Sequence, residues 1–535
     1  MRVRLWAALL VAAICSVTQS ALALAISGHE VMPFTTVGYI EQFILDIIDK
    51  SNQLATGAKI KVNGIEVLIP KNTVIMLPVA LLTPYEIFVS QNPNRTQATA
   101  LQPQSGLAIQ DSPPPPRHFE AQIEGNIVDG QYIAGLVMIS QEFANLGEGV
   151  ITKIDLDTGD IYVGTTLAGV SAASNTVRLK LNDAVGRYGR PIPKQDPRFT
   201  ADTDNPSIRA TTGYPMCVPR FKTKDDPNCP AVNRPLDTFT KKPLTKFAMR
   251  TINAPLPTTV AGALAIPACT ACNRFAQAPF MIGDYVAFSG NFARDEQGPY
   301  ISVWGLIASV GIFTEPGLDP AYIAQDATFI ATLGPNIPGI PQVPLEIADR
   351  IKVEGFTTDP SRPVEIYAVD FDKGRQTDVA RYVTSVLRQA VPFGRFRLQV
   401  QDPTLPTLHD VSGNIVGASR QFMVRISGSV TPVSILKNTK KPLPNPPPQT
   451  LSDGDPVPDP SNHPELVVAN GLIYGQYLAP IPLYIFPENR IPGDPLIPKN
   501  FECLNFLVKG SSPPSLNQLS PWPGATPPTS VFCGP

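Results

Sequence analysis

The sequence predicts a mainly β protein: several small β-barrel or sandwich modules in tandem, with few short helices and proline-rich loops. First, many short segments alternate between apolar and polar residues and end at Gly, Pro, Asn or Asp. Second, the 535 residues include 59 prolines and 38 glycines, which interrupt helices and mark turns. Third, 43% of the residues are hydrophobic and only 16% are charged, a composition that argues against global disorder. The length suggests about three to four domains.

Residues 1–25 are predicted to be a secretory signal peptide. Arg2 and Arg4 precede an apolar run over residues 5–17, and small residues over 21–25 provide cleavage sites. No later window reaches the roughly 18 continuous apolar residues of a membrane helix. We therefore expect a secreted, extracellular protein without a membrane span.

Residues 26–198 are predicted to form an N-terminal β domain. Alternating residues on both sides of Asn63-Gly64 predict a hairpin, because this dipeptide favours the tight hairpin turn. Thr83 and Glu86 form a capping-box pattern with proline at the first helical position, which predicts a short helix. A second hairpin is expected around the turn residues 157–160.

Residues 281–436 are predicted to hold central β modules. Alternating residues over 285–292 and 300–307 flank a polar turn and predict a third hairpin. One helix is expected over 378–390, because its apolar residues recur at helical spacing and end before Pro392.

One local pattern recurs: two apolar residues at alternate positions, followed two residues later by glycine. It occurs at Ala121–Gly125, Val286–Gly290, Ile351–Gly355 and Val424–Gly428. The glycine would permit the bulge or sharp bend that curls a strand into a small barrel. The alternative is that any strand reaching a turn looks like this.

A cysteine- and proline-rich connecting region is expected over 199–280, a proline-rich spacer over 437–465, and an extended, disulfide-linked C-terminal segment over 466–535. Six cysteines remain after the signal peptide: Cys217, Cys229, Cys269, Cys272, Cys503 and Cys533. An even number in an exported chain predicts structural disulfides. Proximity in the sequence favours 217–229 and 503–533, with 269–272 left as a small ring or split between other partners. A redox pair and a zinc site are the disfavoured alternatives, since Pro279 truncates any helix here and no second closely spaced knuckle is present.

Asn94 lies in an N-glycosylation sequon within a polar stretch, so we expect a glycoprotein modified there. The formal net charge is −2, and Lys/Arg runs are few. Such a charge balance argues against nucleic acid as a partner, since phosphate neutralisation needs concentrated positive charge.

No catalytic residue can be assigned from the sequence. There is no Gly-x-Ser-x-Gly motif, and the four histidines all lie in loop-like contexts. Asp155, Asp157 and Asp160 are candidate calcium ligands, because carboxylates at alternate positions suit a hard cation. The favoured alternative is that these aspartates simply form a hairpin turn. No cofactor is expected, and calcium is the one candidate left open.

Several phrases resemble a group of uncharacterised, secreted, β-rich proteins of filamentous fungi and actinobacteria, which have no assigned activity. The phrases cover Ala201–Arg209, Gly213–Arg220, Tyr132–Gln141 and Phe486–Asn489. This resemblance implies export and β architecture and transfers no functional residue.

We therefore expect a secreted protein that acts by surface binding and is associated with the cell wall or extracellular matrix. Its partner would be a wall or matrix polymer or a small molecule. The alternative is an extracellular enzyme acting on polysaccharide or on a secreted small molecule through a carboxylate-based site. The missing catalytic motifs favour the non-enzymatic hypothesis.

Overall fold

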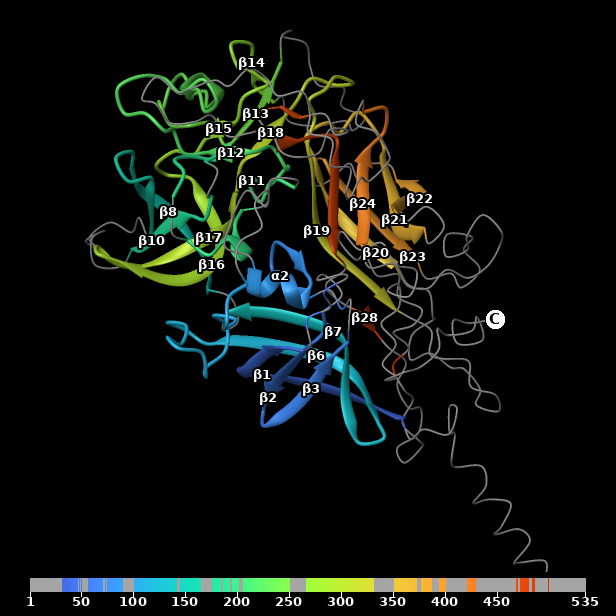
Figure 1. Ribbon diagram of the computed structural model, residues 1–535. Coiled ribbons are helices and arrows are strands. Elements are labelled where there is room, and N and C mark those ends of the chain that lie inside the picture. The colour runs from blue at the N-terminus through green and yellow to red at the C-terminus, as the bar shows by residue number, and fades with distance from the viewer. Residues whose placement is uncertain are drawn as a thin grey trace, which may run out of the picture.

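The computed structural model describes, with short internal gaps, residues 31–89, 101–164, 176–250, 266–331, 351–400, 421–429 and parts of 468–499. The described chain is mainly β, which confirms the predicted fold class (Figure 1). None of its helices is long and apolar enough to cross a bilayer. The predicted signal peptide and the spacer over 437–465 lie outside the described residues.

The first module is a closed barrel of five strands. These are β1 (Val31–Leu45), β2 (Ala58–Val62), β3 (Ile65–Ile69), β6 (Phe119–Val128) and β7 (Gln131–Gln141). Strands β1, β2 and β3 are consecutive antiparallel neighbours, β6 returns to lie beside β1, and β7 closes the ring by pairing in parallel with β3. A fourth strand that returns beside the first is the Greek-key arrangement, and a five-stranded Greek-key barrel is the OB-type architecture.

Two sequence predictions are confirmed in this barrel. Strands β2 and β3 meet at Asn63 and Gly64, whose φ angles of 53° and 75° suit the predicted tight turn. Helix α2 (Pro84–Val89) begins at the predicted capping box, where Glu86 Oε2 accepts from the Thr83 N–H at 2.8 Å. A short pair, β4 (Ile75–Met76) and β5 (Leu81–Leu82), precedes this helix and extends the sheet beyond β7.

The second module repeats the connectivity of the first. Its strands are β8 (Asn145–Asp155), β9 (Asp160–Gly164), β10 (Val177–Leu181), β16 (Tyr285–Asp295) and β17 (Gly298–Ala308). Here β16 pairs with β8, and β17 closes the ring by pairing in parallel with β10. The β8–β9 and β16–β17 hairpins were both predicted. This barrel takes strands from both the predicted 26–198 domain and the predicted 281–436 region.

A long insertion joins β10 to β16. Its short elements are η2 (Pro197–Phe199), β11 (Ile208–Ala210), β12 (Met216–Cys217), η3 (Ala231–Asn233), β13 (Lys246–Met249), β14 (Ala268–Cys269) and β15 (Ala278–Pro279). Strand β18 (Gly311–Phe313) joins β13 after the barrel closes. Buried residues of the insertion, among them Tyr214 and Phe247, belong to the core of the second barrel. The predicted connecting region is therefore part of a packed module.

The two barrels are fixed to each other. Phe199 of the insertion lies in the core of the first barrel, with its ring stacked 5.4 Å from that of Phe119. Arg198 Nη1 donates to the Ser105 carbonyl at 2.6 Å, and the Phe292 N–H donates to Gln141 Oε1 at 2.5 Å.

The third module contains two four-stranded sheets (Figure 1). One has β23 (Arg395–Val400), β20 (Ile351–Thr357), β19 (Ile323–Ala331) and β28 (Tyr484–Ile485). The other has β22 (Thr377–Val386), β21 (Val364–Asp372), β24 (Gln421–Ile426) and β27 (Gln476–Pro480). A separate short pair, β25 (Val468–Ala469) and β26 (Leu472–Ile473), precedes β27. The predicted C-terminal segment thus supplies strands to both sheets.

The prediction of a helix over 378–390 is wrong over 378–386, and residues 387–390 lie outside the described residues. Residues 377–386 form strand β22, which pairs antiparallel with β21 over its length. The segment is rich in valine, threonine and tyrosine, which favour strands, and pairing with β21 outweighs the helical spacing of its apolar residues.

The recurring glycine lies at a register shift in three of the four copies of the pattern: at Gly125 in the first barrel, at Gly290 in the second and at Gly355 in the third module. In each case the extra residue lies on the facing strand, opposite the glycine. A Cβ at Gly125 would meet the Ile133 carbonyl oxygen, and one at Gly355 would meet that of Ala324. Gly428 follows its strand in a turn with a φ of 73°, so there the alternative holds.

Candidate binding surface

The outer wall of the second barrel presents polar and aromatic side chains on neighbouring strands. Ile161 of β9 and Leu179 of β10 are cross-strand partners in the barrel core. Because side chains alternate along a strand, the next pair, Tyr162 and Arg178, points away from the barrel core, where Tyr162 is partly exposed and Arg178 is covered by its neighbours. Together with Lys180, Asp295 and Tyr300, these residues make what we call the tyrosine face.

Two cations and two carboxylates form a network on this face. Arg178 Nη2 lies 2.5 Å from Asp295 Oδ1, and Lys180 Nζ lies 2.7 Å from Asp295 Oδ2. The same cations reach the fully buried Asp160, each at 3.4 Å. Arg178 also donates to Gln297 Oε1 at 2.7 Å, which fixes the turn between β16 and β17. The two positive charges are thus balanced by two negative ones.

The network lowers the pKa of Asp295 to about 2. Partial burial alone would raise this pKa, but hydrogen bonds from Arg178, from Lys180 and from the Gln297 N–H favour the ionised carboxylate. The pKa of Lys180 is raised, because its contacts with Asp295 and Asp160 outweigh the effect of burial. Both groups stay charged at neutral pH, so Asp295 is unsuited to donate a proton.

Cations hold both tyrosine rings in place. Arg178 Cζ and Lys180 Nζ each lie 5.3 Å from the ring centroid of Tyr300. Lys153 Nζ lies 5.0 Å from the centroid of Tyr162. Both distances are within the range of cation–π attraction. Both tyrosines remain partly exposed, so the face offers fixed aromatic surface beside charged groups.

The candidate calcium ligands lie at the edge of this face, but each carboxylate is occupied by a cation. Asp155 pairs with Lys153 at 2.9 Å, Asp157 pairs with Lys222 at 2.8 Å, and Asp160 belongs to the network. Among the described residues, no group of three or more His, Cys, Asp or Glu side chains is placed to hold a metal ion. The Asp155 carboxylate accepts from the Asp157 N–H at 3.0 Å, as the hairpin-turn alternative requires.

Sequence reasoning found the aspartates of this region and missed Tyr162, Arg178, Lys180, Asp295 and Tyr300. The available signal was the alternation within the strands, which places Arg178 and Lys180 on one side of the same strand. What the sequence could not show is that β10 and β17, more than 100 residues apart, are neighbours.

Two of the predicted disulfides are present. Cys217 is bonded to Cys229, and Cys269 to Cys272 as the small ring. Cys503 and Cys533 lie outside the described residues, as does the sequon at Asn94. Of the four histidines, His118 is described; it is exposed, with its ring 4.8 Å from that of Tyr39.

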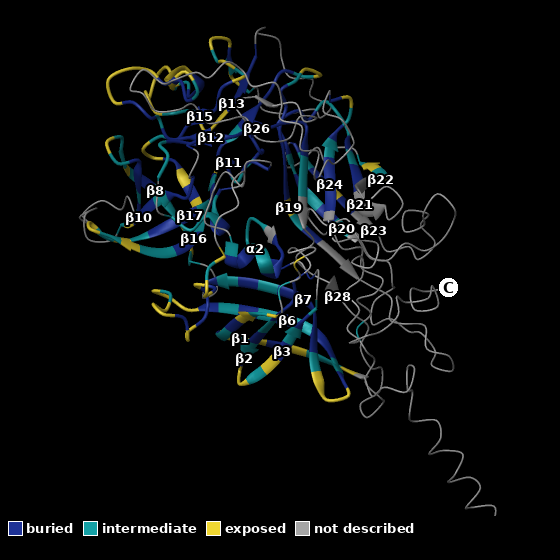
Figure 2. Cartoon of the chain, in the orientation of Figure 1, coloured by how far each residue is buried: buried dark blue, intermediate teal, exposed yellow. Residues whose placement is uncertain are grey.

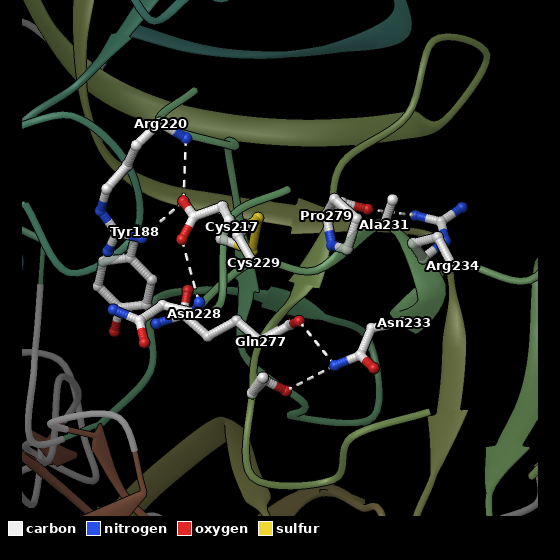
Figure 3. The surroundings of a disulfide bond; sticks show 12 residues. Tyr188, Cys217, Arg220, Asn228, Cys229, Ala231, Asn233, Arg234, Gln277 and Pro279 are labelled. Carbon is white, nitrogen blue, oxygen red and sulfur yellow. Dashed lines mark hydrogen bonds and ion pairs between the residues drawn. A yellow bond between two sulfur atoms is a disulfide. The ribbon is translucent and has the colours of Figure 1, made fainter. Parts of the chain in front are cut away.

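Figure 3 shows how the loops around the first disulfide are held. Arg220 Nη1 pairs with the buried Asp226 at 2.8 Å, and Asn233 Nδ2 donates to the carbonyls of Ala276 and Gln277 at 3.0 Å each. Arg234 is fully buried and binds both oxygens of Asp284 at 2.7 Å. These loops have little regular secondary structure, so few sheet hydrogen bonds fix them. Disulfides and buried polar pairs fix their conformation instead.

No protein-family model, no curated protein and no solved structure matches this chain.

Proposed function

We propose that the protein is a secreted binding protein of the cell wall or extracellular matrix, and that it contacts a neutral or weakly charged polysaccharide through the tyrosine face. One observation carries this proposal: Tyr162 and Tyr300 are held by cations on the outer wall of an OB-type barrel. OB-type barrels bind oligosaccharides and oligonucleotides on the face of their second and third strands and on adjoining loops. In this barrel those strands are β9 and β10.

Charge favours a polysaccharide over a nucleic acid. The two cations of the network are balanced by Asp160 and Asp295, and Lys153 is balanced by Asp155. Nucleic-acid binding needs an excess of positive charge to replace the counterions of the phosphates. A neutral face with fixed aromatic rings suits a sugar polymer better.

Export is part of the same proposal. It is supported by the signal-peptide pattern and by the two disulfides, which persist in oxidising compartments and are rare in the cytosol.

The test is co-sedimentation of the purified mature protein with insoluble wall polysaccharides, combined with an assay for released sugar. We expect retention without product, and Tyr162→Ala and Tyr300→Ala should each weaken retention at least about threefold. Tyr382→Ala is the matched control, because this tyrosine is also exposed but lies in the third module. Retention unchanged by both face variants would refute the assignment of the face.

One observation favours the enzyme as a second candidate. Burial raises the pKa of Asp326, although 37% of its side chain is exposed and Arg209 pairs with it at 2.9 Å. Contacts with Lys352 and Arg395 outweigh burial and lower the pKa of Glu354. Neighbouring carboxylates with pKa values displaced in opposite directions are typical of an acid and a base. Sugar release that is lost in both Asp326→Asn and Glu354→Gln would establish this candidate.

A further inference from the structure

The insertion of the second module carries a protruding loop, residues 235–244, which we call the Phe239 loop. Its ends are joined by a bridge between Leu236 and Pro243 and by the Leu244 N–H, which donates to the Pro235 carbonyl at 2.9 Å. The Asp237 carboxylate accepts from the N–H groups of Phe239 and Thr240 at 3.1 and 2.7 Å. The loop therefore has a defined conformation of its own.

The tip of this loop exposes an apolar side chain beside lysines. Phe239 is 92% exposed, more than any other large hydrophobic residue of the described chain, and Leu236 is 48% exposed. Lys241 and Lys242 follow directly on the tip and are exposed, as is Lys246 at the start of β13. Leaving such a phenylalanine in water forgoes the gain of burying it, so a partner that covers it would be favoured.

The loop is mounted on a cross-linked base. It leads into β13, which pairs with β14, and β14 ends in the Cys269–Cys272 ring. A second exposed aromatic, Phe275, follows this ring, with Arg274 Cζ 5.1 Å from its centroid. Figure 2 shows exposed loops around β13 and β15, at the end of the molecule opposite the first barrel. Aromatic and cationic side chains thus recur on one end of the protein.

We infer that the Phe239 loop docks the protein peripherally on an anionic lipid bilayer, with Phe239 inserted at the interface and Lys241, Lys242 and Lys246 at the headgroups. A protruding side chain can be buried either by a matching pocket on a partner or by a medium that it can penetrate. A bilayer interface is such a medium and needs no matching shape. Its anionic headgroups also complement the charge of the lysines beside the tip. This inference concerns a different surface from the tyrosine face and does not rest on the proposed function.

The test is flotation of the full mature chain with vesicles of phosphatidylcholine, with and without phosphatidylglycerol. We expect binding to the anionic vesicles that weakens as salt is added. Phe239→Ala should weaken it about tenfold or more, as expected for a buried phenylalanine. Lys241→Ala together with Lys242→Ala should weaken it about 25-fold, since each lysine near an anionic surface contributes roughly a fivefold factor. Leu146→Ala is the matched control, because Leu146 is 67% exposed but lies on β8.

The outcomes separate cleanly. Binding to anionic vesicles that both loop variants weaken and the control does not would support the inference. No binding to either vesicle, or equal binding to both that Phe239→Ala leaves unchanged, would overturn it. Retention of the protein by an acidic polysaccharide or an acidic protein through Phe239, without vesicle binding, would also overturn it. Circular dichroism and the absence of free thiols confirm that each variant is folded.

Discussion

Asn126 and Lys499 lie 373 residues apart and are joined like two residues of a β-bridge. The Asn126 Nδ2 donates to the Lys499 carbonyl at 2.8 Å, and the Lys499 N–H donates to Asn126 Oδ1 at 2.9 Å. Asn126 is fully buried on β6. The Lys499 side chain adds contacts to Thr35 and Glu124. These contacts attach residue 499 to the first barrel.

We expect Asn126→Ala to loosen this attachment. Removal of the amide breaks both of these hydrogen bonds, at a cost of about 1–3 kcal/mol. Hydrogen exchange at the Lys499 amide should therefore be at least about fivefold faster than in the wild type. Lys499→Met is the control, because it keeps both bonds to Asn126 and removes only the side-chain contacts. Exchange at residue 499 that is equal in Asn126→Ala and the wild type would contradict this account.

The buried pair of Arg234 and Asp284 should be far more important for stability than an exposed pair. Both side chains are almost wholly buried, so Asp284→Asn would leave a buried guanidinium without its counterion, at a cost of about 3–5 kcal/mol. Lys222→Ala breaks the pair with Asp157, in which both side chains are about two-thirds exposed, and should leave the urea midpoint almost unchanged, because solvent screens such a pair. Urea unfolding of both variants measures the difference. Similar midpoints would show that the Arg234–Asp284 pair contributes little.

The depressed pKa of Asp295 predicts a loss of stability in acid. A carboxylate whose folded pKa is about 2, against an ordinary value of 3.8, stabilises the fold above its unfolded pKa. This contribution, about 2 kcal/mol at most, is lost as the pH falls from about 4 through 2. The Asp295→Asn variant should have a lower free energy of unfolding than the wild type at pH 6, and the two free energies should become equal near pH 2. Parallel stability curves over that range would refute the assignment.

The two disulfides should differ in how much they contribute to the free energy of unfolding. Cys217 and Cys229 close a loop with a sequence separation of 12, whereas Cys269 and Cys272 are separated by 3. In the chain-entropy account, a disulfide stabilises the fold by lowering the entropy of the unfolded chain. The first disulfide should contribute about 3 kcal/mol in this way and the second about 2 kcal/mol. Replacing each pair by serines and measuring urea unfolding tests this order. A larger loss from the 269–272 pair would indicate that local packing around the ring dominates.

Local sequence signals predicted much of this structure. Asn63-Gly64, the capping box at Thr83 and the Cys217–Cys229 pair each join residues at most 12 apart in the sequence, so their outcome depends little on the rest of the chain. The segment over 377–386 shows the limit of such signals. Its spacing fits a helix, but a partner strand supplied by β21 decides its conformation.

The candidate site could not be predicted in the same way. Arg178 and Tyr300 meet because β17 closes the barrel beside β10, after an insertion of about a hundred residues. The entropic cost of closing a loop rises by only about 0.6 kcal/mol for each doubling of its length, so strands far apart in the sequence can still pair. A local sequence pattern does not identify such a distant partner strand. The aspartates were visible as a pattern, whereas the cationic partners of Asp157 and Asp160 belong to other strands or loops.

Replacing the recurring glycines tests whether the close approach of neighbouring strands in the barrels requires glycine. A Cβ at Gly290 would lie 2.4 Å from the Ser302 carbonyl oxygen, and one at Gly125 would lie 2.0 Å from that of Ile133. Backbone atoms cannot move aside as a flexible side chain can, so Gly125→Ala and Gly290→Ala should each cost about 1–3 kcal/mol or more. Gly428→Ala is the matched control from the same sequence pattern, since nothing lies within 4 Å of its Cβ position and only its positive φ opposes the change. We expect that variant to lose about 1 kcal/mol or less in urea unfolding. If Gly428→Ala is as damaging as the two barrel variants, the close approach of the strands is not what requires glycine.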